Sequence, residues 1–165
     1  MTEKKYDFYP FNHSNCVWQQ GNKAIIQHDR YSHYCGYVVF DRKDVPETWF
    51  NDDYDLDSMD LLAIHGGLTY KEVKGDYVVF GFDCMHAGDE DNPLLQDLDY
   101  VIKLVDQMES QLKLHIKNLS KYKKLKTKEQ QAAYLDNIKS KASLKVGFNL
   151  IGTLCFACKT AQEDL

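Results

Sequence analysis

Alternating apolar and polar positions in the first part of the chain predict a β-sheet. Two short runs, residues 16–20 and 24–28, flank Gly21 and Asn22, a pair of residue types that favours a tight hairpin turn. A third run at residues 34–41 is rich in β-branched and aromatic side chains, the residue types that pack well on a pleated sheet. We therefore expect three strands before residue 42.

Two further strands are expected at residues 64–70 and 77–84, joined by a turn at Gly75. The first of them is interrupted by a pair of glycines. In the second, side chains alternate between two faces of the sheet. The more apolar face is predicted to carry Val78, Phe80, Phe82 and Cys84, and the opposite face Tyr77, Val79, Gly81 and Asp83.

The second part of the chain predicts helices. Asn92 suits a helix N-cap and Pro93 the first helical position. Apolar residues then recur at a spacing of about 3.5, which indicates a long amphipathic helix in which His115 takes one of the apolar places. A lysine run at 117–128 follows, and the segment from Thr127 to Gln130 has the form of a capping box, so a second helix is expected there.

These elements predict an α+β fold, with an antiparallel sheet of about four to six strands covered by a long amphipathic helix and followed by a C-terminal helical appendage. We expect one domain over residues 1–165, with the sheet and long helix in 1–116 and the basic appendage in 117–165. Residues 144–159 fit a strand or a helix equally well. The apolar seam of the long helix could pair two copies in a homodimer, but the same seam would cover a sheet.

Composition agrees with a single domain and divides the charge unevenly. The chain has 165 residues, of which 44% are hydrophobic, and a net charge of −5. Residues 1–100 hold 19 Asp and Glu against 8 Lys and Arg, whereas residues 101–165 hold 6 against 12. An acidic total disfavours a dedicated nucleic-acid binder, so direct nucleic-acid binding is not expected.

The lack of a targeting signal and the pattern of cysteines predict a cytoplasmic protein. The N-terminal lysines precede no apolar stretch, and no run approaches the roughly 18 apolar residues that span a bilayer. The cysteine count is five, an odd number without disulfide-framework spacing. Cys155 and Cys158 form a CxxC pair, for which buried structural thiols are favoured over a redox or zinc role.

Four histidine and carboxylate side chains are expected to converge at one end of the sheet, beside the start of the long helix. They are His65, Asp83, His86 and Asp89. Such groups can bind a divalent metal, which makes a metal the candidate cofactor, or they can form a base–orienter pair for proton transfer. The alternative is structural: His65 bonds a neighbouring loop, Asp83 caps a turn, and Asp89 lies in a solvated loop.

The candidate catalytic residues are therefore His65, Asp83 and His86. The candidate ligand-binding residues beside them are Gly66, Gly67, Thr69, Tyr70, Cys84 and Asp89. Cys84 is also a conceivable nucleophile next to His86, although adjacent side chains on a strand point to opposite faces.

Three motifs in order give the chain a resemblance to a family. The motifs are Cys35-Gly36-Tyr37-Val38, His65-Gly66-Gly67-Leu68-Thr69-Tyr70, and a segment from Gly81 to Asp89 that reads GFDCMHAGD. Over residues 30–112 the chain resembles an uncharacterised family of small proteins from phage genomes and mobile elements. The resemblance implies a phage-type origin and directs attention to the last two motifs as the site.

Two functions from different classes follow. The favoured one is a non-catalytic, anti-CRISPR-like inhibitor in the bacterial cytoplasm, whose partner is a host protein such as a nucleic-acid-binding defence effector. Its contact surface would be acidic and aromatic, comprising Trp49, Phe50, Asp52, Asp53, Tyr54, Asp55 and Asp57. The alternative is an enzyme or ligand-binding protein, metal-dependent or not, acting on a nucleotide or other phosphate-bearing ligand. The lysine run could attract such a ligand, steer an acidic partner, or be a solvated helix connection.

Overall fold

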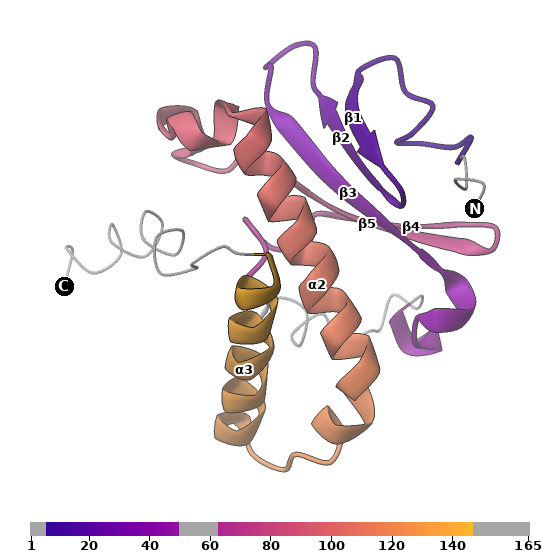
Figure 1. Ribbon diagram of the computed structural model, residues 1–165, viewed down its shortest axis with the longest axis vertical. Helices are drawn as coiled ribbons and strands as arrows, with labels where there is room; N and C mark the ends of the chain where they lie inside the picture. The colour runs from indigo at the N-terminus through magenta and orange to yellow at the C-terminus, as the bar shows by residue number, and fades with distance from the viewer. Residues whose placement is uncertain (1–5, 50–62, 147–165) are drawn as a thin grey trace.

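The computed structural model describes residues 6–49 and 63–146, which form the predicted α+β fold. An open antiparallel sheet of five strands carries helices on one face (Figure 1). The spatial order of the strands is β1-β2-β3-β5-β4. Their bounds are β1 (Cys16–Gln20), β2 (Lys23–Gln27), β3 (Tyr34–Asp41), β4 (Tyr70–Lys74) and β5 (Tyr77–Asp83).

Two long helices follow the sheet along the chain, and short helical turns lie in the connecting segments. The short 3-10 turns are η1 (Arg42–Asp44), η2 (Glu47–Trp49), η3 (Asp89–Asp91) and η4 (Pro93–Gln96), and the two long helices are α2 (Leu98–Tyr122) and α3 (Lys128–Val146). Asn92 caps η4 through its side chain, and Asp97 caps α2 by accepting a hydrogen bond from the backbone of Asp99 at 3.0 Å. The long helix thus begins after a separate turn, because Asn92 and Pro93 start η4 and not the helix itself.

The predicted capping box starts α3. The Thr127 hydroxyl accepts a hydrogen bond from the backbone N–H of Gln130 at 3.2 Å. The Gln130 side chain in turn accepts one from the backbone of Lys126 at 3.0 Å. Reciprocal bonds of this kind satisfy amides that a helix start would leave unpaired, so the helix begins where the sequence predicts.

The pairing of β3 with β5 joins distant parts of the chain. Cys35 lies opposite Asp83 at one end, and Asp41 lies opposite Tyr77 at the other. The expected hairpin of β4 and β5 is present, but a strand over residues 64–70 is wrong except at Tyr70. Gly66 and Gly67 have φ of +62° and +80°, a left-handed backbone that cannot continue a strand, so residues before Tyr70 form a loop.

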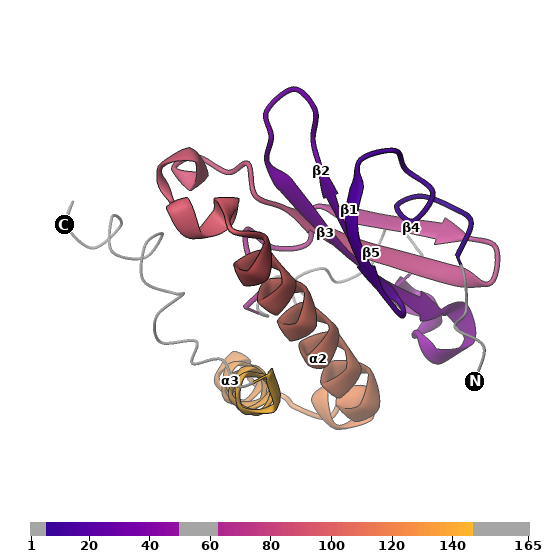
Figure 2. The same ribbon diagram turned by 45° about the horizontal axis from the view of Figure 1, so that its top comes forward.

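The main core lies between the sheet and α2. Val38, Phe80 and Phe82 project from the sheet into a cluster with side chains of α2 such as Val105 and Leu112, all 0–1% exposed. The apolar face of β5 is therefore the predicted one. Figure 2 shows α2 lying across the sheet with α3 beside it. Leu135, Ile138 and Ala142 of α3 are also buried, the first two in the same cluster, so the appendage packs on the domain as far as it is described.

Gly36 lets α2 approach the sheet closely. An ideal Cβ at this position would lie 2.6 Å from Cγ2 of Val105 and 2.7 Å from the ring of Phe82, closer than real Cβ contacts. Helix and sheet could keep this spacing only with a residue that lacks a side chain. The glycine of the first motif therefore has a packing role.

The opposite face of the sheet is covered by the N-terminal segment. Tyr6, Phe8 and Phe11 pack against one another and join the cluster around Tyr37 and Val79. The Tyr9 and Tyr37 hydroxyls are hydrogen-bonded at 2.6 Å. Both faces of the central strands are therefore buried, in agreement with the near-continuous apolar sequence of β3.

An aromatic cluster holds α2, α3 and η2 together. The ring of Trp49 stacks on His115 at 5.7 Å, and Tyr122 and Tyr134 lie 5.2 and 6.0 Å from the same imidazole. Trp49 and His115 are both 0% exposed. Trp49 therefore belongs to the core and not to the exposed aromatic surface predicted for it, because its ring packs between η2 and α2.

Candidate metal centre and adjoining cavity

The loops on either side of the β4–β5 hairpin bring three predicted site residues together. His65 lies in the loop before β4, and His86 and Asp89 lie in the segment after β5. Because the two strands are antiparallel, the start of β4 and the end of β5 meet at the same end of the sheet. This convergence, predicted from the sequence, is present.

One carboxylate oxygen is the centre of the cluster. Oδ2 of Asp89 lies 2.9 Å from Nε2 of His65 and 3.2 Å from Nδ1 of His86, and it accepts a hydrogen bond from the His86 backbone N–H at 2.8 Å. The three side chains each offer one ligand-type atom, and these atoms lie within 4.8 Å of one another. Among the described residues this is the only group of three or more such side chains with that spacing.

Glycine makes room for the His86 ring. An ideal Cβ on Gly66 would lie 1.9 Å from Cε1 of His86, so the imidazole rests directly on the Gly66 backbone. The N–H of Gly67 closes the loop by donating to the carbonyl of Ile64 at 2.9 Å. The two glycines after His65 thus provide the turn and the space that the cluster requires.

Asp83 lies at the margin of the cluster. Its Oδ1 accepts a hydrogen bond from the backbone N–H of Met85 at 3.0 Å, which caps the turn after β5. The same oxygen is 3.7 Å from Nδ1 of His86. Asp83 therefore both fixes the turn and places a second negative charge beside His86.

The protonation state of Asp89 suits a ligand. Burial alone would raise the pKa of this carboxyl group, but the hydrogen bonds from His65 and His86 outweigh burial and lower the pKa below its ordinary value. The carboxylate is therefore charged at neutral pH, although its side chain is only 11% exposed.

Three other predicted site residues do not join the cluster. Burial is the main cause that raises the pKa of Cys84, so it remains a thiol and not a nucleophilic thiolate. Tyr70 points to the opposite face of the sheet, where its ring packs against Tyr9 and Tyr37. Thr69 is exposed, and its backbone N–H extends the pairing to Gly81 at 2.9 Å.

A cavity of about 580 Å³ adjoins the cluster. His86 and Asp89 line it, together with Cys84 and residues from the end of β2, from the turn between β2 and β3 and from η4. These additional residues include Gln27, Tyr31, Ser32, His33, Leu95 and Gln96. His33 was not among the candidate site residues predicted from the sequence.

His33 presents a half-buried imidazole to the cavity. Burial chiefly, and then the neighbouring His28, lower its pKa, which favours the neutral ring. Its Nδ1 has no hydrogen-bond partner among residues 6–49 and 63–146. The pairing of β3 with β5 brings this turn near the motif, because the backbone N–H of Cys84 donates to the carbonyl of Tyr34 at 3.0 Å. The local sequence around His33 contains no signal of that pairing.

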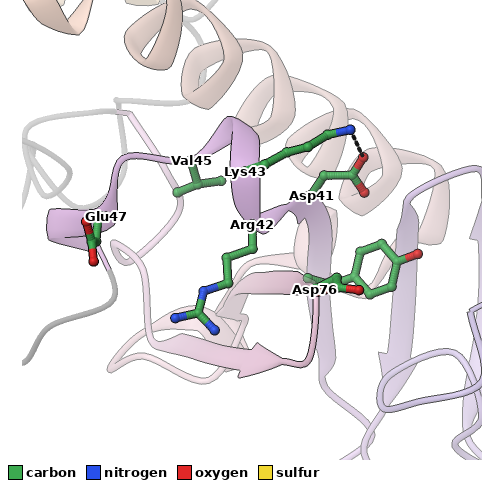
Figure 3. Close-up of a pocket in the computed structure, with 7 residues that line it drawn as sticks. Asp41, Arg42, Lys43, Val45, Glu47 and Asp76 are labelled. Carbon is green, nitrogen blue, oxygen red and sulfur yellow. Dashed lines mark ion pairs between the residues drawn. The ribbon is translucent and has the colours of Figure 1, made fainter.

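A second cavity, of about 740 Å³, lies at the other end of β3 and β5 (Figure 3). Its walls come from η1, η2 and the β4–β5 turn, and they mix both signs of charge. The lining residues are Asp41, Arg42, Lys43, Val45, Glu47, Asp76 and Tyr77. Lys43 and Asp41 form an ion pair at 3.9 Å, drawn as a dashed line. No group with metal-ligand spacing occurs there among the residues described.

The acidic and aromatic surface predicted for a protein partner lies mostly outside the described residues. Phe50, Asp52, Asp53, Tyr54, Asp55 and Asp57 all belong to the segment 50–62. The inhibitor function, its host partner and the phage-type origin therefore stay predictions.

Comparisons with known proteins give no relative: no family model matches the chain, and neither a curated protein nor a solved structure matches it. Within the described residues, no helix has both the length and the apolar character needed to cross a membrane.

Proposed function

We propose that this protein binds a divalent transition-metal ion through His65, His86 and Asp89, and that the metal holds a small ligand in the adjoining cavity. The observation that carries the proposal is the close approach of three ligand-type atoms from two loops. It corresponds to the metal-dependent alternative among the functions inferred from the sequence.

The two distances from Asp89 to the histidines suit tetrahedral coordination. With metal–ligand distances of about 2.0–2.1 Å, neighbouring ligand atoms in a tetrahedral site are about 3.3 Å apart. The distances from Asp89 Oδ2 to the two histidine nitrogens, 2.9 and 3.2 Å, are close to that value. Small movements of the side chains would accommodate an ion.

The donor types favour some metals over others. Two imidazoles and one carboxylate suit zinc, iron, cobalt, nickel or manganese, whereas magnesium and calcium prefer oxygen ligands only. The contacts around the ligands also resemble those of metal sites. The His86 backbone N–H holds the Asp89 carboxylate, and Gly66 fixes the position of the His86 ring, so the ligands are oriented before any ion binds.

Three protein ligands leave a coordination position for water or a ligand, which is the arrangement of catalytic and not of structural zinc sites. Two of these ligands, His86 and Asp89, line the 580 Å³ cavity, so the open position has space beside it. A metal held by these three residues would lower the pKa of a water bound at the open position and would polarise phosphoryl or carbonyl oxygens. Metal-assisted hydrolysis is the reaction class that such a site would support.

The test is metal binding by the full chain after treatment with a chelator. We expect one Mn²⁺ or Co²⁺ ion per chain by calorimetry, and at least about tenfold weaker binding in His65→Ala and Asp89→Ala. His13→Ala is the matched control, because His13 is exposed and lies outside the cluster. Absence of binding by the wild type, or wild-type affinity in both site variants, would refute the proposal.

Cysteine coordination must be separated from the proposed site. A variant with Cys155→Ser and Cys158→Ser removes the CxxC pair. The proposal requires this variant to bind Co²⁺ with unchanged affinity and without the absorption band of a cobalt–thiolate bond. If removing the two cysteines abolishes binding, the metal site is elsewhere.

A further inference from the structure

A strongly basic surface lies on the hairpin of α2 and α3. Its seven members, hereafter the lysine surface, are Lys113, Lys117, Lys121, Lys123, Lys124, Lys126 and Lys128. No Asp or Glu occurs between residues 110 and 128. All seven side chains are exposed, so the segment presents an uninterrupted positive charge to solvent.

Most of this charge has no acidic partner among the residues that the structure describes. Lys113 pairs with Glu109 at 2.5 Å. Within the part of the chain that the structure describes, no carboxylate forms an ion pair with the other six. Lys113, Lys117 and Lys121 also follow one another at a spacing of four, on one side of α2, about 6 Å apart along the helix axis. Like charges at that spacing destabilise a helix, so folding does not account for this row.

The lysine surface is remote from the candidate metal centre. Figure 1 shows the turn between α2 and α3 at the opposite end of α2 from η3 and η4. The helix has 25 residues and is therefore about 37 Å long. The Debye length is about 8–10 Å at physiological salt, so a partner at this end responds to the local positive charge and not to the net charge of −5.

We propose that the lysine surface binds the phosphate backbone of double-stranded nucleic acid without reading its sequence. Lysine is a point charge suited to phosphates, whereas base recognition uses the planar groups of arginine, asparagine or glutamine. This surface contains no arginine. Its binding mode is therefore electrostatic. The net charge of the whole chain led us to expect no direct nucleic-acid binding, and this proposal revises that expectation.

The lack of exposed apolar and aromatic side chains on the lysine surface favours a duplex over other anionic partners. The exposed large hydrophobic residues in the described part of the chain are Val17, Tyr31, Val73, Met85 and Leu94, none of which lies on the lysine surface. Insertion into a lipid surface requires exposed apolar side chains, and a protein interface requires an apolar or aromatic centre. Single strands bind by stacking on exposed aromatic rings, which this surface lacks. A duplex backbone needs none of these features.

Fluorescence anisotropy of the full chain with a labelled duplex of mixed sequence tests the proposal. If three phosphates are contacted, affinity falls about 40-fold between about 50 and 200 mM KCl. The combined substitutions Lys117→Gln, Lys121→Gln and Lys124→Gln are expected to weaken binding at least about tenfold at the lower salt and to flatten the salt dependence. The duplex should bind more tightly than either of its separate strands.

A control with the same change in net charge makes the test specific. The control variant combines Lys43→Gln, Lys103→Gln and Lys141→Gln, which are at exposed positions away from the lysine surface. Its affinity for the duplex should change less than about threefold. Circular dichroism of both variants verifies that α2 and α3 remain folded. Equal losses in both variants, no duplex binding at low salt, or preferential binding to anionic vesicles or polyglutamate would overturn the proposal. Metal-site variants should leave duplex binding unchanged.

Discussion

Replacing His115 with leucine is expected to stabilise the protein and to reduce its sensitivity to acid. The His115 ring is 0% exposed, and neither of its nitrogens has a hydrogen-bond partner among the described residues. It is surrounded by the rings of Trp49, Tyr122 and Tyr134. A leucine of similar volume would keep the packing and remove both buried nitrogens.

The pH dependence follows from burial, which lowers the pKa of His115 from 6.5 to about 4. The unfolded chain therefore binds a proton below about pH 6.5 that the folded protein accepts only below about pH 4. The contribution to stability is fully present above pH 6.5 and is lost as the pH falls towards 4. The total loss is about 3 kcal/mol, of which about 2 kcal/mol is reached at pH 5.

At neutral pH the leucine variant should gain about 1 kcal/mol, because unsatisfied buried nitrogens cost about 1–3 kcal/mol and some of this is offset by imperfect packing. The difference between the variant and the wild type should then widen to about 3 kcal/mol at pH 5. Other titrating groups affect both proteins equally, so the difference isolates His115.

Urea unfolding followed by circular dichroism at pH 7.5, 6 and 5 measures this difference. His13→Leu is the control, because His13 is exposed and its substitution should leave the pH dependence unchanged. A constant gap between wild type and His115→Leu across this range would show that the protonation of His115 is not linked to folding.

Three further predictions test the loop, the core and the cap. Gly66→Ala should weaken Mn²⁺ binding at least about tenfold because its Cβ would displace His86, whereas Gly75→Ala, which also has positive φ but open space around it, should cost only about 1 kcal/mol of stability and leave calorimetric metal binding intact. Leu112→Ala should destabilise the protein by about 3 kcal/mol in urea unfolding, since this side chain is fully buried, and a change below about 1 kcal/mol would contradict the packing described. Thr127→Ala should cost about 1 kcal/mol and speed amide exchange in the first turn of α3; unchanged exchange would exclude the capping role.

Local sequence rules account for most of the fold. Gly21 and Asn22 turn the first hairpin and Thr127 caps α3, as their sequence context predicts. Asn92 and Pro93, predicted to begin the long helix, begin η4 instead. These features depend on neighbours in the chain, so a single sequence contains the information. The convergence of His65, His86 and Asp89 was also predictable, because the β4–β5 hairpin places its flanking loops together.

Features that depend on distant parts of the chain could not be predicted in this way. The turn containing His33 reaches the cavity because β3 pairs with β5, and this pairing joins residues that are far apart in sequence. The segment before Tyr70 was assigned to a strand from its residue types, although the left-handed backbone at Gly66 excludes one. Trp49 was expected at an interface because charged residues are near it in the sequence, but its ring is buried by stacking on His115.

The placement of the proposed metal ligands on either side of one hairpin has a consequence for the stability of the sheet edge. His65 and Asp89 are 24 residues apart, and β4 and β5 lie between them. An ion bound to both would cross-link the unfolded chain as a disulfide does, with a loop-closure contribution of about 3 kcal/mol. Within the described sheet β4 pairs only with β5. Removing the ion with a chelator would therefore first increase the fraying of β4, whereas amide hydrogen exchange in the strands beneath α2 would stay slow.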